Sequence, residues 1–317
     1  MLTARQVTVF GGSGFIGRHL VAHLAATGAI VRVATRHPKP PQERASRGTI
    51  QQVEADLLDE QAVRAAIRGS DAVVNLVGIL SESGRHTFTA IHEEGARQVA
   101  AIACDLGATR LIHMSALGAS QLAPARADRS KAAGEDAVRN AFPGAIIVRP
   151  SLVFGPDDHF FNGFARMALR LPVLPLIGGG RTRFQPVAVQ DVVNGLAALL
   201  EGSASRNSTY EFGGPQIFTF KKLLNFLCAE IRARPLLVPV PFIAAEVLGA
   251  ILQMLPRPPL TRDQARLLAT DKVVSGTEPT LAALGIEPTP LEAVVPRYLA
   301  RYRRDKAPDN NVRSNDG

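Results

Sequence analysis

Gly11-Gly12-Ser13-Gly14-Phe15-Ile16-Gly17 follows a short apolar run, residues 6–10, and opens a segment with apolar residues at helical spacing, residues 14–27. Between a first strand and a first helix, this pattern is typical of the turn that binds the pyrophosphate of a dinucleotide. Gly11 would permit the tight turn, Gly14 would let backbone N–H groups approach the pyrophosphate, and Gly17 would let helix and strand pack closely. The helix N-terminus would face the phosphates with free N–H groups and its positive dipole end. We expect the whole turn to contact the cofactor, including Ser13, Phe15 and Ile16, although glycines without this context could form an ordinary hinge.

Strand-like and helix-like segments alternate from residue 6 to about residue 156. After the first pair, strands are expected at 30–35, 50–55, 72–77, 110–114 and 145–148, and helices near 60–68, 92–106 and 129–140. This alternation predicts an α/β fold built on a Rossmann-type, doubly wound parallel sheet.

The alternation loosens after Pro156, where proline and glycine become frequent. We expect an NAD(P)-binding Rossmann domain over residues 1–156 and a smaller, mixed C-terminal lobe over residues 157–306 that is interleaved with it. Residues 307–317 are polar and end in glycine, so a disordered tail is expected there.

The end of the second predicted strand bears on the choice of cofactor. A site that prefers NADH generally places Asp or Glu there to bind the ribose hydroxyls, whereas this chain has Arg36 followed by His37. The guanidinium of Arg36 can bind a 2′-phosphate through charge-assisted hydrogen bonds, and Arg18 is expected on the same side. The alternative is a pair of ordinary surface arginines in a basic protein. The sequence therefore favours NADPH over NADH.

The ends of the next two strands are expected to complete the cofactor site. Asp56 and Leu57 end the third strand, where a carboxylate can accept a hydrogen bond from the adenine amine. The fourth strand ends in Leu76, Val77 and Gly78, where small or apolar groups would pack on the ribose.

The composition restricts the class of partner. A net charge of +8 permits an anionic partner, but the chain has no Trp, three Tyr and no aromatic-basic interleaving of the kind that stacks single-stranded bases, so nucleic acid is not expected. No apolar run reaches the roughly eighteen residues of a membrane span. Because a strand is expected to begin by Val7, we expect no leader peptide. Cys104 and Cys228 lie outside any metal-ligand spacing, and both are expected in the core.

Residues 242–255 are apolar around most of a predicted helix, with Glu246 and Gln253 as the only polar side chains. The segment is too short to span a bilayer. A core helix and a helix that docks on another protein or at a membrane interface are both open. Basic residues at 297–306 would suit an acidic protein surface or anionic lipid headgroups.

The order of several short motifs resembles the extended short-chain dehydrogenases/reductases. The motifs are the glycine turn, AD at 55–56, NLVG at 75–78, a serine ending the fifth strand, RPSLVFGP at 149–156 and PVAVQDVV at 186–193. More narrowly, residues 129–139, 149–167, 259–268 and 296–303 are similar to an atypical branch of this family. That branch contains the NADPH-binding accessory subunit of respiratory complex I, alpha-subcomplex subunit nine, and its bacterial relatives.

The resemblance covers the family's catalytic positions only in part. Active members use a Ser, a Tyr that transfers a proton, and a Lys four residues later that lowers the pKa of the Tyr. Ser115 and Lys131 match, but the Tyr position is Ala127, whose methyl group cannot transfer a proton. The resemblance therefore implies that Ser115, Lys131 and Pro150 hold the cofactor, and no independent activity is expected.

Three histidines could be offered as replacement bases. His113 lies inside the fifth predicted strand and is expected in the core. His86 and His92 flank the long helix without a visible carboxylate partner. No catalytic base is therefore assigned.

Residues and resemblance together predict an NADPH-binding, redox-inactive accessory or assembly subunit of respiratory complex I. It would bind other subunits of the complex, with a peripheral contact to the membrane or to quinone-site subunits, on the cytoplasmic face of a bacterial inner membrane. Two alternatives are open. One is an active NADPH-dependent reductase or nucleotide-sugar-type epimerase or dehydratase, and the other is a sensor of the NADPH/NADP⁺ ratio.

Overall fold

A seven-stranded parallel sheet organises the computed structural model, which describes residues 6–38, 48–202, 207–253 and 260–303. The strand order is β11-β6-β5-β4-β1-β2-β3. The strands are β1 Gln6–Phe10, β2 Ile30–Thr35, β3 Thr49–Glu54, β4 Ala72–Asn75, β5 Arg110–Met114, β6 Ile146–Pro150 and β11 Thr209–Phe212. Because β1 pairs with β2 on one side and β4 on the other, the strand order reverses beside β1, where ligands of such sheets bind. The predicted doubly wound α/β fold is confirmed.

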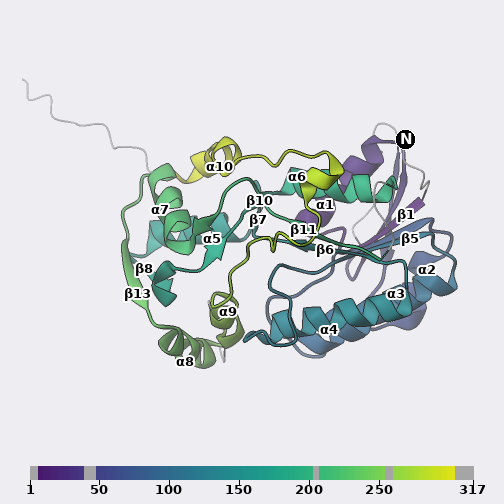
Figure 1. Ribbon diagram of the computed structural model, residues 1–317, viewed down its shortest axis with the longest axis horizontal. Helices are drawn as coiled ribbons and strands as arrows, with labels where there is room; N and C mark the ends of the chain where they lie inside the picture. Colours follow the sequence, from purple (N-terminus) through teal and green to yellow (C-terminus); the bar gives the residue numbers. More distant parts are fainter. Residues whose placement is uncertain (1–5, 39–47, 203–206, 254–259, 304–317) are drawn as a thin grey trace, which may run out of the picture.

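Helices cover both faces of this sheet (Figure 1). One face packs on α1 Phe15–Ala26 and α6 Val189–Leu200, and the other packs on α2 Glu60–Ile67, α3 Ala96–Asp105 and α4 Arg126–Ala141. Neighbouring residues of one strand point to opposite faces of the sheet. Val74 packs in the core beneath α1, and Val73 packs in the core beneath α3. Burial on both faces explains why the central strands β1 and β4 are mostly apolar, whereas the edge strand β3 is polar and partly exposed.

The remaining elements form a smaller lobe with its own core, rich in phenylalanine (Figure 1). They are β7 Val153–Phe154, α5 Phe160–Arg170, β8 Val173–Ile177, β9 Arg183–Phe184, β10 Val187–Ala188, β12 Phe218–Thr219, α7 Phe220–Glu230, β13 Leu236–Val240, α8 Phe242–Leu252, α9 Arg262–Leu267 and α10 Leu291–Leu299. The 3-10 turns η2 Gly178–Gly180 and η4 Ala300–Tyr302 complete it, whereas η3 Leu281–Leu284 packs on the sheet core beside α6 and β11. The chain interleaves the lobes, because α6 and β11 return to the sheet. A boundary at residue 156 stays a prediction, and residues 307–317 lie outside the described residues.

Two helices begin earlier than the sequence predicts. The helix expected near 129–140 starts at Arg126, because the carboxylate of Asp263 accepts hydrogen bonds from the N–H groups of Arg126 (2.6 Å) and Ala127 (3.0 Å). This cap comes from a distant part of the chain and leaves no local signal. The helix expected near 92–106 starts at Thr89 as a π-helical segment, η1 Thr89–Gly95, that continues into α3.

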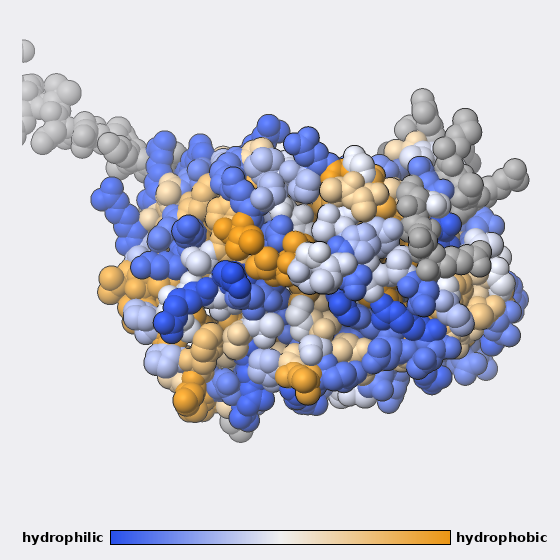
Figure 2. All heavy atoms as spheres, in the orientation of Figure 1, coloured by the Kyte–Doolittle hydropathy of each residue, from blue (hydrophilic) through white to orange (hydrophobic). Residues whose placement is uncertain are grey.

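The apolar helix α8 packs with its small residues inward. Ala245 and Gly249 are buried, and a Cβ on Gly249 would lie 2.7 Å from the backbone N of Arg262 in α9. Large apolar side chains on its outer side are 48–80% exposed, namely Ile243, Val247, Leu248 and Ile251. Apolar atoms accordingly gather at the lower left of Figure 2, over α8. Of the described residues, none belongs to a helix with both the length and the apolar character needed to cross a bilayer.

The cysteine prediction was wrong for one residue. Cys228 is buried as expected, but Cys104 is exposed. Cys104 lies on the solvent side of α3, whose buried face is formed by its neighbours Ile102 and Ala103 and by the preceding turn.

Candidate functional site

The carboxyl ends of β1, β2, β3 and β4 meet around a cavity of about 480 Å³. Its lining includes most of the predicted cofactor residues: Gly11, Ser13, Gly14, Arg36, His37, Asp56, Leu57, Leu76, Val77 and Gly78. The rest of the lining consists of Phe10, Ala34, Thr35, Ala55, Ile79, His86 and Ile91. The cavity therefore lies at the switch point of the sheet, where the strand order predicts a dinucleotide.

The glycine turn has the geometry of a phosphate-binding turn. Gly11 has a φ of 75°, which glycine adopts without strain, and the Gly14 N–H donates to its carbonyl at 3.0 Å. A Cβ on Gly17 would overlap the backbone of Gly11 and Gly12, so Gly17 brings the helix against the turn itself. No side chain caps α1, and its first turn has no acidic residue. Its N–H groups are therefore available to an anion.

The residues that follow in the turn differ in what they offer. Ile16 packs against the core, and the ring of Phe15 lies edge-on to His19 with centroids 5.9 Å apart, so a contact of either residue with a cofactor stays a prediction. Arg18 forms an ion pair with Asp157 at 3.3 Å and is not among the described residues that line this cavity or its neighbour. The side chain of Arg18 therefore points to Asp157 in this structure, and its contact with a 2′-phosphate stays a prediction.

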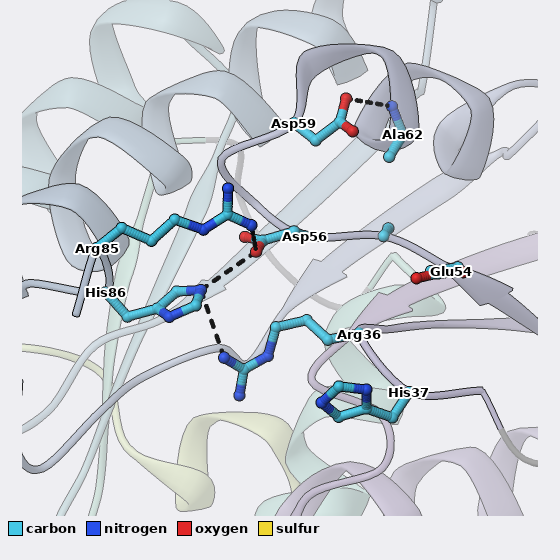
Figure 3. A pocket seen from close by; sticks show the side chains of 9 residues that line it. Arg36, His37, Glu54, Asp56, Asp59, Ala62, Arg85 and His86 are labelled. Atoms are coloured by element: carbon cyan, nitrogen blue, oxygen red, sulfur yellow. Dashed lines mark hydrogen bonds and ion pairs between the residues drawn. The ribbon is translucent and has the colours of Figure 1, made fainter. Parts of the chain in front are cut away.

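A second cavity of about 590 Å³ adjoins the first where β2 and β3 end, the end predicted to bind adenosine, and shares Arg36, His37, Ala55, Asp56 and His86 with it (Figure 3). In it, Asp56 Oδ2 lies 2.5 Å from Arg85 Nη2 and 3.2 Å from His86 Nε2. His86 Nε2 also lies 3.4 Å from Arg36 Nη1. Burial acts to raise the pKa of Asp56, but hydrogen bonds from the Leu58 N–H, His86 and Arg85 outweigh it and lower the pKa.

The sequence predicted only part of the side chains around Asp56. His86 does have a carboxylate partner, contrary to expectation, and Arg85 was missed. Both residues lie on the loop between β4 and η1, which folds back over the end of β3. No spacing in the sequence indicates that fold, since 29 residues separate Asp56 from Arg85.

Ser115 and Lys131 meet beside the Gly78 end of the first cavity, although neither residue lines it. Lys131 Nζ donates to the carbonyl oxygen of Ser115 at 3.4 Å, and its burial lowers the pKa of this lysine. A Cβ on Gly78, which lines the cavity, would lie 3.7 Å from Lys131 Nζ. The Ser115 hydroxyl is buried and has no hydrogen-bond partner among the described residues. An orphaned buried hydroxyl is costly, so this end fits the polar nicotinamide portion of a dinucleotide. The Pro150 ring is buried and lines neither cavity, so its role stays a prediction.

The position at which active family members carry the catalytic tyrosine holds a buried alanine, Ala127. Ala127 is 2% exposed, and its N–H is held by Asp263. All three tyrosines of the chain are engaged elsewhere. Tyr298 donates to Asp158 Oδ2 at 2.6 Å, with its pKa raised by burial and by that carboxylate. Tyr210 packs in the sheet core, and Tyr302 accepts from Arg166.

Neither buried histidine is placed to act as a base. His92 Nε2 accepts from the Ile79 N–H at 3.0 Å, and its Nδ1 lies 2.8 Å from Ser130 Oγ. Burial, with the nearby charge of Lys131, lowers the pKa of His92 to about 3, so the ring is neutral with both nitrogens engaged. His113 is buried beside Asn75, and burial lowers its pKa to about 3. The predicted core placement of His113 is confirmed.

A buried ion pair lies beside Lys131. Lys272 Nζ is 2.7 Å from Asp128 Oδ2, and the carboxylate side chain is 2% exposed. Burial raises the pKa of Asp128 despite the opposing effect of Lys272. Lys272 follows α9, so the C-terminal lobe contacts the start of α4 through both Lys272 and Asp263. The sequence gives no signal for either contact.

Comparisons with known proteins agree with this geometry. The family model described as the NAD dependent epimerase/dehydratase family matches residues 7–213. The NADH dehydrogenase [ubiquinone] 1 alpha subcomplex subunit 9 of Arabidopsis thaliana mitochondria is 35% identical over 94% of this chain and 78% of its own length. A ceramide reductase of Caulobacter vibrioides is 31% identical over 78% of this chain and 77% of its own length. The fold is shared with an NAD-bound dTDP-glucose 4,6-dehydratase of Streptomyces venezuelae (TM-score 0.70, 22% identity, 94% and 96% of the two chains covered).

Proposed function

This chain belongs to the NAD dependent epimerase/dehydratase family, and we propose that it is an NADPH-binding accessory or assembly subunit of respiratory complex I without redox chemistry of its own. The family and the fit of the switch-point cavity identify the cofactor as a nicotinamide dinucleotide. NADPH, the complex and a position on the cytoplasmic face of a bacterial inner membrane are the finer parts of the proposal. One observation carries it: the cofactor turn is kept, while the proton-transfer position is a buried alanine.

Different residues of the chain would bind different parts of the dinucleotide. The N-terminus of α1 would bind the pyrophosphate, and Arg36 would bind the 2′-phosphate. Leu76 and Val77 would pack on the ribose, while Lys131 and the free hydroxyl of Ser115 would hold the nicotinamide end. A ligand that binds only the folded state stabilises it, by about 2.7 kcal/mol at a hundred times its Kd. The cofactor is therefore proposed to have a structural role.

The contacts around Ala127 support the absence of turnover. A nicotinamide ring exchanges hydride with a substrate, and the family's reactions need a proton partner beside it. Asp263 holds the first turn of α4 where that partner would be, and His92 is neutral and engaged at both nitrogens. This arrangement favours holding the cofactor over a reductase or epimerase reaction.

We expect the tagged chain to co-fractionate with subunits of NADH:quinone oxidoreductase when membranes of its source are solubilised in mild detergent. Mass spectrometry of the purified fraction is the measurement. The same tag on an unrelated peripheral protein is the control. A chain that fractionates alone contradicts the proposal. Steady NADPH oxidation by the purified chain with carbonyl substrates also contradicts it and supports a reductase.

The outer side of α8 supports an assembly role. Its large apolar side chains face outward while small residues anchor it on α9, so the helix cannot bury them by turning. Glu246 is paired with Arg266 at 2.8 Å and with Arg262 at 3.4 Å, which leaves no unpaired carboxylate on this face among the described residues. Exposed apolar patches of this kind mark interaction sites. We propose that a neighbouring subunit at the membrane surface covers it.

Replacing Ile243, Val247 and Ile251 together with Ser is expected to abolish co-fractionation with the complex, because a few residues near the centre of an interface carry most of its binding energy. The monomer should keep its melting temperature within about 2 °C, since these side chains are exposed. Leu122→Ser, which is 94% exposed on the other lobe, is the matched control. An unchanged association contradicts the proposal. A second result would also contradict it. If the isolated wild-type chain binds anionic vesicles and the triple variant does not, a lipid surface covers this side of α8 and not a protein subunit.

A further inference from the structure

We infer that Arg85 and His86 act with Arg36 as the 2′-phosphate site, and that Asp56 holds Arg85 and His86 for this purpose. This set of three basic residues is called the clamp below. The inference rests on the proposed NADPH binding and adds the residues that would reject NADH.

The three clamp residues come from two separate elements and face one cavity. Arg36 ends β2, whereas Arg85 and His86 lie on the loop after β4, and all three line the cavity of about 590 Å³. Figure 3 shows Arg36 and Arg85 reaching toward His86 and Asp56 from opposite sides. Arg36 has no carboxylate partner among the described residues, and its recorded contact is with His86. A phosphate between these groups would accept hydrogen bonds from two guanidinium groups and an imidazole.

Asp56 couples the clamp to the adenine. Its Oδ2 atom already accepts from Arg85 and lies within hydrogen-bond distance of His86. An adenine amine that binds Asp56 competes with these two side chains for the same oxygen. A 2′-phosphate offers Arg85 and His86 a replacement anion, whereas the ribose hydroxyl of NADH does not. Discrimination would therefore have an attractive part for NADPH and a repulsive part for NADH.

The other charges in the cavity oppose a phosphate, and the second arginine counteracts part of this repulsion. Glu54 and Asp59 line it with Asp56. Asp59 is committed to the Ala62 N–H as the cap of α2, but Glu54 would repel a phosphate from the adjoining strand. His37 adds a further imidazole to the lining. Three carboxylates against Arg36 alone would leave a large negative excess in the cavity, and Arg85 reduces this excess.

Calorimetric titration of the full chain with NADPH, NADH, 2′-phospho-AMP and AMP tests the clamp. Arg85→Met should weaken NADPH and 2′-phospho-AMP by roughly ten- to a hundredfold, the range for a lost hydrogen bond to a charged group. NADH and AMP should be unchanged or bind more tightly, because Asp56 is freed for the adenine. His86→Gln should act in the same direction with a smaller effect. Arg64 is a surface arginine that pairs with Asp105, so Arg64→Met is the matched control. It should leave the affinity for all four ligands unchanged.

The outcomes of these titrations distinguish failure of the clamp from failure of the proposed function. A wild-type chain that binds NADH as tightly as NADPH overturns the proposed NADPH preference. A wild-type chain that prefers NADPH, with an Arg85→Met variant that keeps the full preference, overturns the clamp alone. An equal loss of all four ligands in that variant also overturns it, since Arg85 would then only order the loop. Unchanged thermal unfolding of the variants would show that they are folded.

Discussion

Replacing Arg36 with Asp is expected to weaken NADPH binding by at least about a hundredfold while changing NADH affinity by less than about threefold. The substitution removes a charge-assisted hydrogen bond to the phosphate, a contact of about 1.5–3 kcal/mol, and adds a carboxylate that repels it. Each 1.4 kcal/mol corresponds to a factor of ten in affinity. Arg36 faces both cavities at the adenosine end and has no carboxylate partner among the described residues, so its loss should affect little else.

The fluorescence of reduced nicotinamide gives the measurement, both as a titration and on protein purified without added nucleotide. Arg36→Lys keeps a positive charge but not the fork of donors and should fall between the wild type and Arg36→Asp. An equal loss of NADPH and NADH would show that Arg36 does not contact the 2′-phosphate.

Replacing Lys272 with Met is expected to destabilise the chain by about 3–5 kcal/mol at neutral pH. The change leaves the buried carboxylate of Asp128 without its partner at 2.7 Å, and breaking a buried pair from one side has a cost of that size. The pair joins the C-terminal lobe to α4 beside Lys131. The loss should therefore also loosen the nicotinamide end of the site.

The effect of Lys272→Met should depend on pH with a defined sign. Burial raises the pKa of Asp128 in the folded chain, and Lys272 opposes this, so removing Lys272 raises that pKa further. The folded variant then binds a proton more tightly than the unfolded chain. Its free energy of unfolding should fall as the pH rises from the ordinary carboxyl pKa of about 3.9 through the raised folded value.

Urea unfolding of the wild type and the variant at several pH values between 4.5 and 7.5 measures this difference. The decrease in the free energy of unfolding of Lys272→Met relative to the wild type should be smaller near pH 4.5, where Asp128 takes up a proton. Asp128→Asn combined with Lys272→Met removes both charges and should recover much of the stability. A loss of equal size at every pH would mean that Asp128 is not the group responsible.

The sequence determined those features whose cause is local. The glycine turn, the buried strands and the helix after the turn are encoded by residues that are close together, since a positive φ at Gly11, an uncapped helix start and apolar periodicity each depend on a few neighbours. Parallel strands then bring their carboxyl ends to one edge of the sheet. The cavity with Arg36, Asp56 and Leu76 could therefore be predicted before any contact was known.

The tertiary structure alone decided which partners these residues meet. Arg18 turns to Asp157, Asp263 caps α4 from 137 residues away, and Lys272 reaches Asp128 across 144 residues. Periodicity likewise leaves the direction of α8 open, because a helix that is apolar all round has no preferred inner face. Packing chose that face through the smallest side chains, Ala245 and Gly249, since only they allow α8 to approach α9 closely. Spacing in a sequence reports period and residue type, whereas contacts between distant segments depend on how the loops and lobes pack.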